Sequence, residues 1–179
     1  MNLEIGGQRV KTEWSEDWHV MDCIDDDNID IIHDLSEFPY PIEDNTYDVV
    51  YMSHVLEHLS WVITPKILEE IYRIIKPGGS VEIHVPDLKK LVDAYLNPEL
   101  IKENNAGWYP HNPKEEPIKW FNGRMFNYGP GNENFHRAAF DEEFLKQSLS
   151  EVGFKELKKI DHSRGSFHGW INLGIKGIK

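Results

Sequence analysis

Residues 47–88 read YDVVYMSHVLEHLSWVITPKILEEIYRIIKPGGSVEIHVPDL and decide the fold class. Two apolar runs rich in β-branched residues, Asp48–Met52 and Ser80–Val85, predict buried strands. Between them, apolar residues recur at helical spacing, and Pro65 suits a first turn that Thr64 can cap. Two strands joined by such a helix should be parallel, with a right-handed crossover. The stretch therefore predicts an α/β unit whose polar loop lies at the ligand-binding end of a sheet.

Three further strands are expected upstream, and each runs into a glycine or an acid. Leu3–Ile5 is followed by Gly6 and Gly7, Trp18–Asp22 ends in an aspartate, and Asp30–Leu35 carries Asp34 near its end. No amphipathic helix is evident between Asp22 and Tyr47, so the helical layer should be pared down. Acidic residues at such strand ends are typical of sheets that bind nucleosides.

The C-terminal half predicts two helices and a closing hairpin. Asp87 should cap one helix and Asp141 the other. Phe154–Ile160 and Phe167–Ile175 should pair as an antiparallel hairpin around Arg164-Gly165. The apolar residues expected to share one face of the helix after Asp87 are Leu88, Leu91, Val92, Tyr95 and Leu96.

Composition bounds the class of protein. A chain of 179 residues suits one domain, 1–179, in which 97–137 forms an insert rich in aromatic residues but without periodicity. A net charge of −12 argues against a broad nucleic-acid surface. One cysteine fits a reducing compartment, and neither a leader nor a membrane-spanning stretch is visible, so a cytoplasmic location is expected, with no membrane partner.

The motifs of the opening stretch resemble those of a known family. Ser-His-Val-Leu-Glu-His at 53–58, Arg-x-x-Lys-Pro-Gly-Gly at 73–79 and Val-Pro-Asp-Leu at 85–88 are similar to class I S-adenosylmethionine-dependent methyltransferases. The resemblance implies a Rossmann-like sheet, mostly parallel with an antiparallel C-terminal pair, and methyl transfer from S-adenosylmethionine (SAM). It extends in weaker form over most of the chain.

The same resemblance assigns the residues that would hold SAM. The glycine turn would lie against the methionine part, Asp22 would accept hydrogen bonds from the ribose, and Asp34 with Leu35 would contact the adenine. Gln8 stands where the family has its second glycine, a departure that a one-residue deletion would relieve by giving Gly7 that role. The full predicted set is Glu4, Gly6, Gly7, Asp22, Asp34, Leu35, Ser53 and His54.

Three histidines are the candidate catalytic residues. His54 follows the strand that should end beside the methyl group, so it is the first candidate for acceptor positioning or proton removal. His58 lies one helical turn on, and His136 arrives from the insert and would complete the pocket from the other side. Each of them singly is also compatible with a structural role, and no metal is expected.

Two other functions stay open beside methyl transfer. The pattern His54-x-x-Glu57-His58 matches inverted zinc peptidases, but that pattern must lie within a helix, whereas here it follows a strand. A fold with a disturbed glycine turn also suits a binding or scaffold module that has lost catalysis. The expected acceptor is a small molecule or a saccharide, and the aromatic insert suits either a substrate cover or a homodimer contact.

Overall fold

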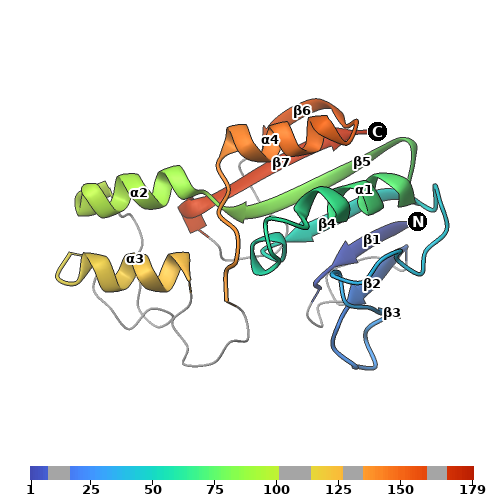
Figure 1. The fold of residues 1–179 in the computed structure, drawn as a ribbon, viewed down its shortest axis with the longest axis horizontal. Helices are drawn as coiled ribbons and strands as arrows, with labels where there is room; N and C mark the ends of the chain where they lie inside the picture. The colour runs from blue at the N-terminus through green and yellow to red at the C-terminus, as the bar shows by residue number, and fades with distance from the viewer. Residues whose placement is uncertain (8–16, 101–113, 127–134, 161–168) are drawn as a thin grey trace.

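A computed structural model describes residues 1–7, 17–100, 114–126, 135–160 and 169–179, and its centre is a seven-stranded sheet (Figure 1). The strands lie in the order β3-β2-β1-β4-β5-β7-β6. The strands are β1 (Asn2–Ile5), β2 (Trp18–Asp22), β3 (Ile31–Ile32), β4 (Tyr47–Ser53), β5 (Ile75–Pro86), β6 (Lys155–Ile160) and β7 (Asn172–Ile178). The helices are α1 (Thr64–Ile74), α2 (Leu88–Leu96), α3 (Pro117–Met125) and α4 (Glu142–Glu151), with 3-10 turns η1 (Leu56–His58), η2 (Pro98–Leu100) and η3 (Gly169–Ile171).

The sheet has the expected mixed topology. Strands β1 to β5 pair in parallel, and β7 lies antiparallel between β5 and β6. From β1 the chain moves outward to β2 and β3, then returns to β4 on the other side of β1. This reversal is a topological switch point, where open α/β sheets bind ligands at the carboxyl ends of their strands. The predicted fold class is confirmed.

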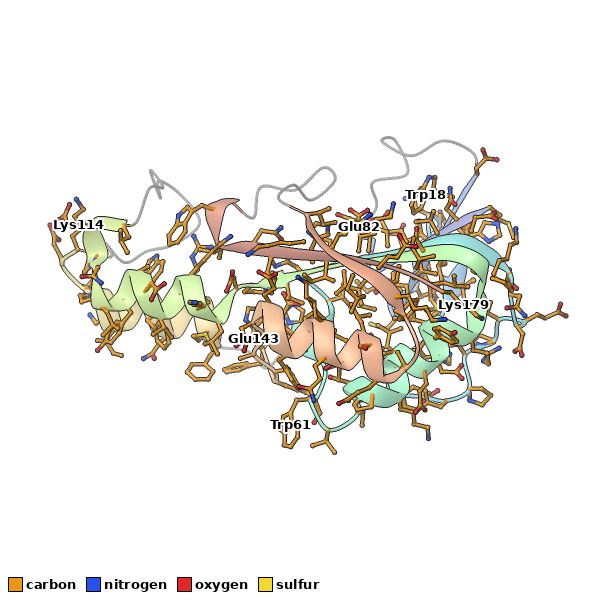
Figure 2. All side chains as sticks on the ribbon, turned by 90° about the horizontal axis from the view of Figure 1, so that it is seen from above. Trp18, Trp61, Glu82, Lys114, Glu143 and Lys179 are labelled. Atoms are coloured by element: carbon orange, nitrogen blue, oxygen red, sulfur yellow. The ribbon has the colours of Figure 1, made fainter. Side chains whose placement is uncertain are left out.

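Helices α1 and α4 cover one face of the sheet, as both views show (Figures 1 and 2). The apolar face of α1 is fully buried and consists of Ile67, Leu68, Ile71 and Ile74. The predicted cap is wrong: Thr64 is the first residue of the helix, and the capping position belongs to Ile63, which makes no side-chain cap. Proline at the start supplies a preset φ instead.

A loop takes the place of a helix between β3 and β4, as the missing periodicity predicted. It is fastened to α1 by Arg73, whose guanidinium donates to the carbonyls of Ile42 (2.7 Å) and Tyr40 (3.2 Å) and to the Asp44 carboxylate (2.7 Å). Glu70 accepts from the same guanidinium (2.7 Å) and from the Tyr40 amide (2.7 Å). Hydrogen bonds therefore attach this loop to α1, whereas a helix at this position would pack through an apolar face.

Helices α2 and α3 extend beyond the carboxyl end of β5 and form a second, smaller apolar cluster (Figure 1). Its buried members are Leu91, Ala94, Trp120 and Ile171. Asp87 caps α2 as predicted, through its carboxylate and the amides of Lys89 (3.1 Å) and Lys90 (3.4 Å). The predicted buried face of α2 is wrong, because Val92, Tyr95 and Leu96 are exposed. Helix α3 lies inside the insert that was predicted to lack regular structure.

Asp141 caps α4 as predicted, since its carboxylate accepts from the Phe144 amide at 2.8 Å. Strands β6 and β7 form the predicted antiparallel pair, although the turn expected at Arg164-Gly165 lies outside the described residues, as does Gln8. Among the helices that the structure describes, none is both long and apolar enough to cross a membrane.

Candidate functional site

The carboxyl ends of β1, β2 and β4 bring the predicted site residues to one edge of the sheet. Ile5 pairs with Met21 on one side and Met52 on the other, so Gly6 follows in line with Asp22 and Ser53. The Gly6 amide donates to the Met21 carbonyl at 2.8 Å, which continues the ladder by one residue.

The turn after β1 requires glycine for two separate reasons. Gly6 has φ +74°, and a Cβ there would lie 2.1 Å from Cγ2 of Val55, in the loop after β4. At Gly7 a Cβ would lie 2.6 Å from the carboxyl carbon of Glu4. The first glycine lets the β4 loop close over the turn, and the second leaves room for a carboxylate beneath it. The turn therefore has its backbone in close contact with Val55 and Glu4 at the switch point.

Acids stand at the ends of the next two strands. Asp22 is half-buried, and its carboxylate accepts from the Ile24 amide at 3.2 Å. Asp34 is exposed and caps the following turn, accepting from the Ser36 amide (2.8 Å) and hydroxyl (2.7 Å). These two hydrogen bonds lower the pKa of the Asp34 carboxyl, so it is ionised at neutral pH. Leu35, next to it, packs against the main core.

His54 leaves β4 with a positive φ of 55°, uncommon for a residue with a side chain. Its amide donates to the His84 carbonyl at 2.9 Å. Its ring is held at both nitrogens, with Nε2 3.1 Å from Asn172 Oδ1 and Nδ1 3.1 Å from Glu57 Oε1. A ring held on both sides has a fixed orientation at the strand end.

The contacts of His54 continue into a chain of buried polar groups across β7 and β5. Asn172 Nδ2 lies 3.0 Å from His84 Nδ1, and His84 Nε2 lies 3.0 Å from Glu82 Oε1. If the Asn172 amide donates to His84, the His84 proton is on Nε2 and is donated to Glu82. Glu82 points away from the face covered by α4 (Figure 2). Sequence reasoning missed Asn172, because no local pattern marks a residue 118 positions from its partner.

Glu57, His58 and His136 form a cluster beyond His54. The His58 and His136 rings lie 4.8 Å apart in an edge-to-face arrangement, and Glu57 is 1% exposed. The Glu57 carbonyl accepts from the amides of Arg137 (2.7 Å) and Ala138 (3.1 Å), which ties η1 to the segment after α3. The structure thus brings together two of the predicted catalytic histidines, from η1 and from the end of the insert.

The charges of this cluster depend on one another. Burial alone would raise the pKa of the Glu57 carboxyl, but the contact with His54 and the nearby His58 and His136 rings hold it below its usual value. Burial lowers the pKa of the His136 ring. The carboxyl is therefore ionised, and the His136 imidazole is neutral at pH 7.

His136 also lines a small hollow between the end of β5, α2 and α3. The hollow is bounded by Pro86, Leu88, Leu91, Arg124, Met125, His136, Ala138 and Ala139. Six of its eight lining residues are apolar, but the space between them is about the size of one water molecule, so it does not admit an organic molecule in this conformation.

A sheet of this order, with a glycine turn after β1 and acids after β2 and β3, defines a Rossmann-like protein of the nucleoside-binding class. Residues 7–159 match the sequence model of the family described as a methyltransferase domain. The chain therefore belongs to the methyltransferase domain family.

Curated relatives and a solved structure agree with this assignment. The ubiquinone/menaquinone biosynthesis C-methyltransferase UbiE of Hydrogenovibrio crunogenus is 30% identical over 147 residues, which are 80% of this chain and 53% of the relative. A demethylmenaquinone methyltransferase of Listeria monocytogenes is 25% identical over 171 residues, 92% of this chain and 60% of the relative. The chain thus spans between half and two thirds of these relatives.

The fold itself is shared with a SAM-dependent methyltransferase from Archaeoglobus fulgidus. The TM-score is 0.61 at 18% identity, and the match covers 99% of this chain and 85% of that structure. The whole described sheet, including the antiparallel C-terminal pair, is therefore that of the class I methyltransferases that the motifs resembled.

Proposed function

We propose that the chain binds SAM at the carboxyl edge of β1, β2 and β4 and transfers its methyl group to a small organic acceptor. The observation that carries the proposal is the Gly6 turn, which presents backbone in line with Asp22 and Ser53 at the switch point. The residues present fit this cofactor, because the glycine turn adds no side chain of its own at the switch point and two acids follow in order.

Different residues would contact different parts of the cofactor. Asp22 would accept hydrogen bonds from ribose hydroxyls, and Asp34 with Leu35 would contact the adenine. Glu4 beneath Gly7 supports the glycine turn. When bound, SAM supplies an electrophilic methyl group on a sulfonium. The protein then has to position the acceptor in line with that group and exclude water, and positioning alone provides much of the acceleration.

His54, His58 and His136 stay predictions as catalytic residues. The double anchoring of the His54 ring supports a positioning role at the end of β4, because proton removal would require one of its contacts to break. His136 faces the hollow as a neutral imidazole, which is the form that accepts a proton.

The acceptor is proposed to be a ring compound that enters from the side of α2 and α3. The neighbouring apolar cluster around Trp120 and the quinone-related names of the curated relatives support this choice, and the water-sized hollow would have to open to admit the ring. A saccharide acceptor and a homodimer contact through 97–137 stay predictions. The zinc-peptidase alternative loses support, since 54–58 forms a loop and a 3-10 turn instead of an α-helix.

Titration of the purified chain with SAM and with S-adenosylhomocysteine tests the proposal. We expect saturable binding that Asp22→Ala and Glu4→Ala weaken, whereas Asp27→Ala, an exposed acid in the loop after β2, leaves it unchanged. Absence of binding by the unaltered chain would refute the proposal. Binding without production of S-adenosylhomocysteine on quinol, phenol and saccharide acceptors would identify a module that has lost catalysis.

A further inference from the structure

We propose that Glu57, His58 and His136 form a binding site for a divalent transition-metal ion, with Zn²⁺ the best match. One ligand atom from each residue lies within 4.8 Å of the others. The inference goes beyond methyl transfer and does not depend on it. It also replaces the expectation from sequence that no metal is bound.

Backbone contacts already place the two halves of this site. Glu57 and His58 belong to η1, which directly follows the β4 loop, and His136 precedes α4. The Glu57 carbonyl accepts two hydrogen bonds from Arg137 and Ala138, and the His136 amide donates to the Phe126 carbonyl at 3.0 Å. The donor atoms are thus held near one another by the main chain, independently of any ion.

The ligand atoms lack partners that their burial requires. Within the described part of the chain, Glu57 Oε2 and His58 Nδ1 are buried with no hydrogen-bond partner, whereas Glu57 Oε1 contacts His54 Nδ1 at 3.1 Å. Leaving a buried polar atom without a partner destabilises the fold, and more so when the atom carries charge. One cation at the centre of the three residues satisfies them together.

The chemistry of the donors selects the metal. Two imidazoles and one carboxylate suit Zn²⁺ and its first-row neighbours, whereas Mg²⁺ and Ca²⁺ prefer sets made of oxygen. Tetrahedral ligands around Zn²⁺ lie about 3.3 Å apart, so the rings of His58 and His136 must rotate inward to close on an ion. Three protein ligands leave a fourth position open to water or to an oxygen of another molecule.

His54 becomes a supporting residue of this site. Its Nδ1 contacts Glu57 Oε1 at 3.1 Å, which leaves Oε2 to face the ion. A ligating carboxylate that is held by a second residue is a common feature of metal sites. The arrangement differs from the zinc-peptidase pattern, because Glu57 is a ligand and His54 is outside the ligand set.

Titration of the chelator-treated 179-residue chain with Co²⁺ tests the proposal through visible absorption bands, which report coordination without any assay of activity. We expect one equivalent of Co²⁺ to bind, with bands typical of low coordination, and Zn²⁺ to displace it. His58→Ala and His136→Ala should each weaken binding roughly tenfold or more. His33→Ala, a histidine whose ring contacts the Glu37 carbonyl elsewhere in the fold, is the control and should bind as the unaltered chain does.

Glu57→Gln, which keeps the shape of the side chain, and a thermal melt of each variant separate loss of a ligand from loss of the fold. The proposal fails if the unaltered chain binds no stoichiometric Co²⁺ or Zn²⁺, or if folded His136→Ala binds as tightly as the unaltered chain. SAM titration of the same sample keeps the two proposals apart, because either can fail while the other stands.

Discussion

At the scale of single residues, two glycines with nearly the same backbone φ require glycine for different reasons. Gly6 and Gly78 have φ of +74° and +79°. A Cβ at Gly6 would collide with Val55, while at Gly78 no atom lies within 4 Å. Gly78 needs glycine for its conformation alone, whereas Gly6 needs it for conformation and for close approach of the β4 loop.

Substituting alanine at each position should therefore separate the cost of a left-handed backbone from the cost of a steric clash with Val55. Gly78→Ala should lower the free energy of unfolding by about 1–2 kcal/mol, the cost of a left-handed conformation. Gly6→Ala should lower it by roughly 1–3 kcal/mol more, because the β4 loop must shift. Urea denaturation measures both. SAM titration should show weaker binding only for Gly6→Ala, and equal affinity in the two variants would contradict the role given to this turn.

At the scale of elements, Arg73 joins α1 to the loop that replaces a helix. Arg73→Ala removes hydrogen bonds to two carbonyls and two carboxylates, and the loss should cost about 1–3 kcal/mol in the free energy of unfolding. Lys76→Ala is the control. Its ammonium contacts exposed Asp48 on the surface, so that change should cost clearly less than Arg73→Ala. Similar losses for both variants by urea denaturation would show that the loop does not depend on Arg73.

Glu142 links α4 to β6 and should give the fold a defined sensitivity to acid. Hydrogen bonds from Lys146 (2.6 Å) and Lys159 (2.9 Å) lower the pKa of this carboxyl from 4.5 to about 2. A carboxyl with a lowered pKa in the folded state stabilises the fold above its unfolded pKa, and the contribution is lost as the pH falls. The contribution of Glu142 should therefore be complete above pH 4.5 and disappear towards pH 2.

Thermal melts over this pH range check the prediction. Glu142→Gln should melt below the unaltered chain at pH 7, and the difference should shrink as the pH falls through that window. Glu143→Gln, at the neighbouring exposed carboxylate, should show no such trend. A constant difference between Glu142→Gln and the unaltered chain at every pH would contradict the assignment.

At the scale of the whole molecule, the proposed cofactor site joins the ends of several strands. A ligand present at 100 times its dissociation constant stabilises the folded state by about 2.7 kcal/mol. For a domain of this size, that should raise the melting temperature by about 5–10 °C. Differential scanning fluorimetry with increasing S-adenosylhomocysteine measures the shift. Asp22→Ala should reduce it, and an unchanged melting temperature at saturating ligand would count against the site.

The strands could be predicted along the chain because each carries its own signal, whereas their order in the sheet was not predicted. β2 was predicted to the residue, whereas β5 begins at Ile75, earlier than the predicted Ser80, and contains the Lys-Pro-Gly-Gly residues. Helix α3 was missed, because its nine residues lie in a stretch rich in Pro, Asn and Gly and carry no clear apolar face. The exposed side of α2 was also missed, since helical spacing does not reveal which face meets a partner. The treatment of 1–179 as one domain stays a prediction.

Part of the candidate site could also be predicted from sequence, and part could not. Glycine and acids at strand ends could be placed together, because parallel strands bring their carboxyl ends to one edge. The contact of His54 with Asn172 could not be derived, since it joins segments far apart in the sequence. His136 was expected to complete the pocket, but its ring contact with His58 was not foreseen. The burial of Glu57 also gave no local signal, because η1 is a single 3-10 turn.

The position of β7 between β5 and β6 has a consequence for biosynthesis. The ribosome delivers β5 about ninety residues before the strand that pairs with it, so a nascent chain carries an open edge on β5 until β7 emerges. Asn172 opens β7, which means that the His54 ring gains this partner only late in synthesis. A chain interrupted before residue 172 would keep most of the residues named above and still lack Asn172, the partner that helps to orient the His54 ring.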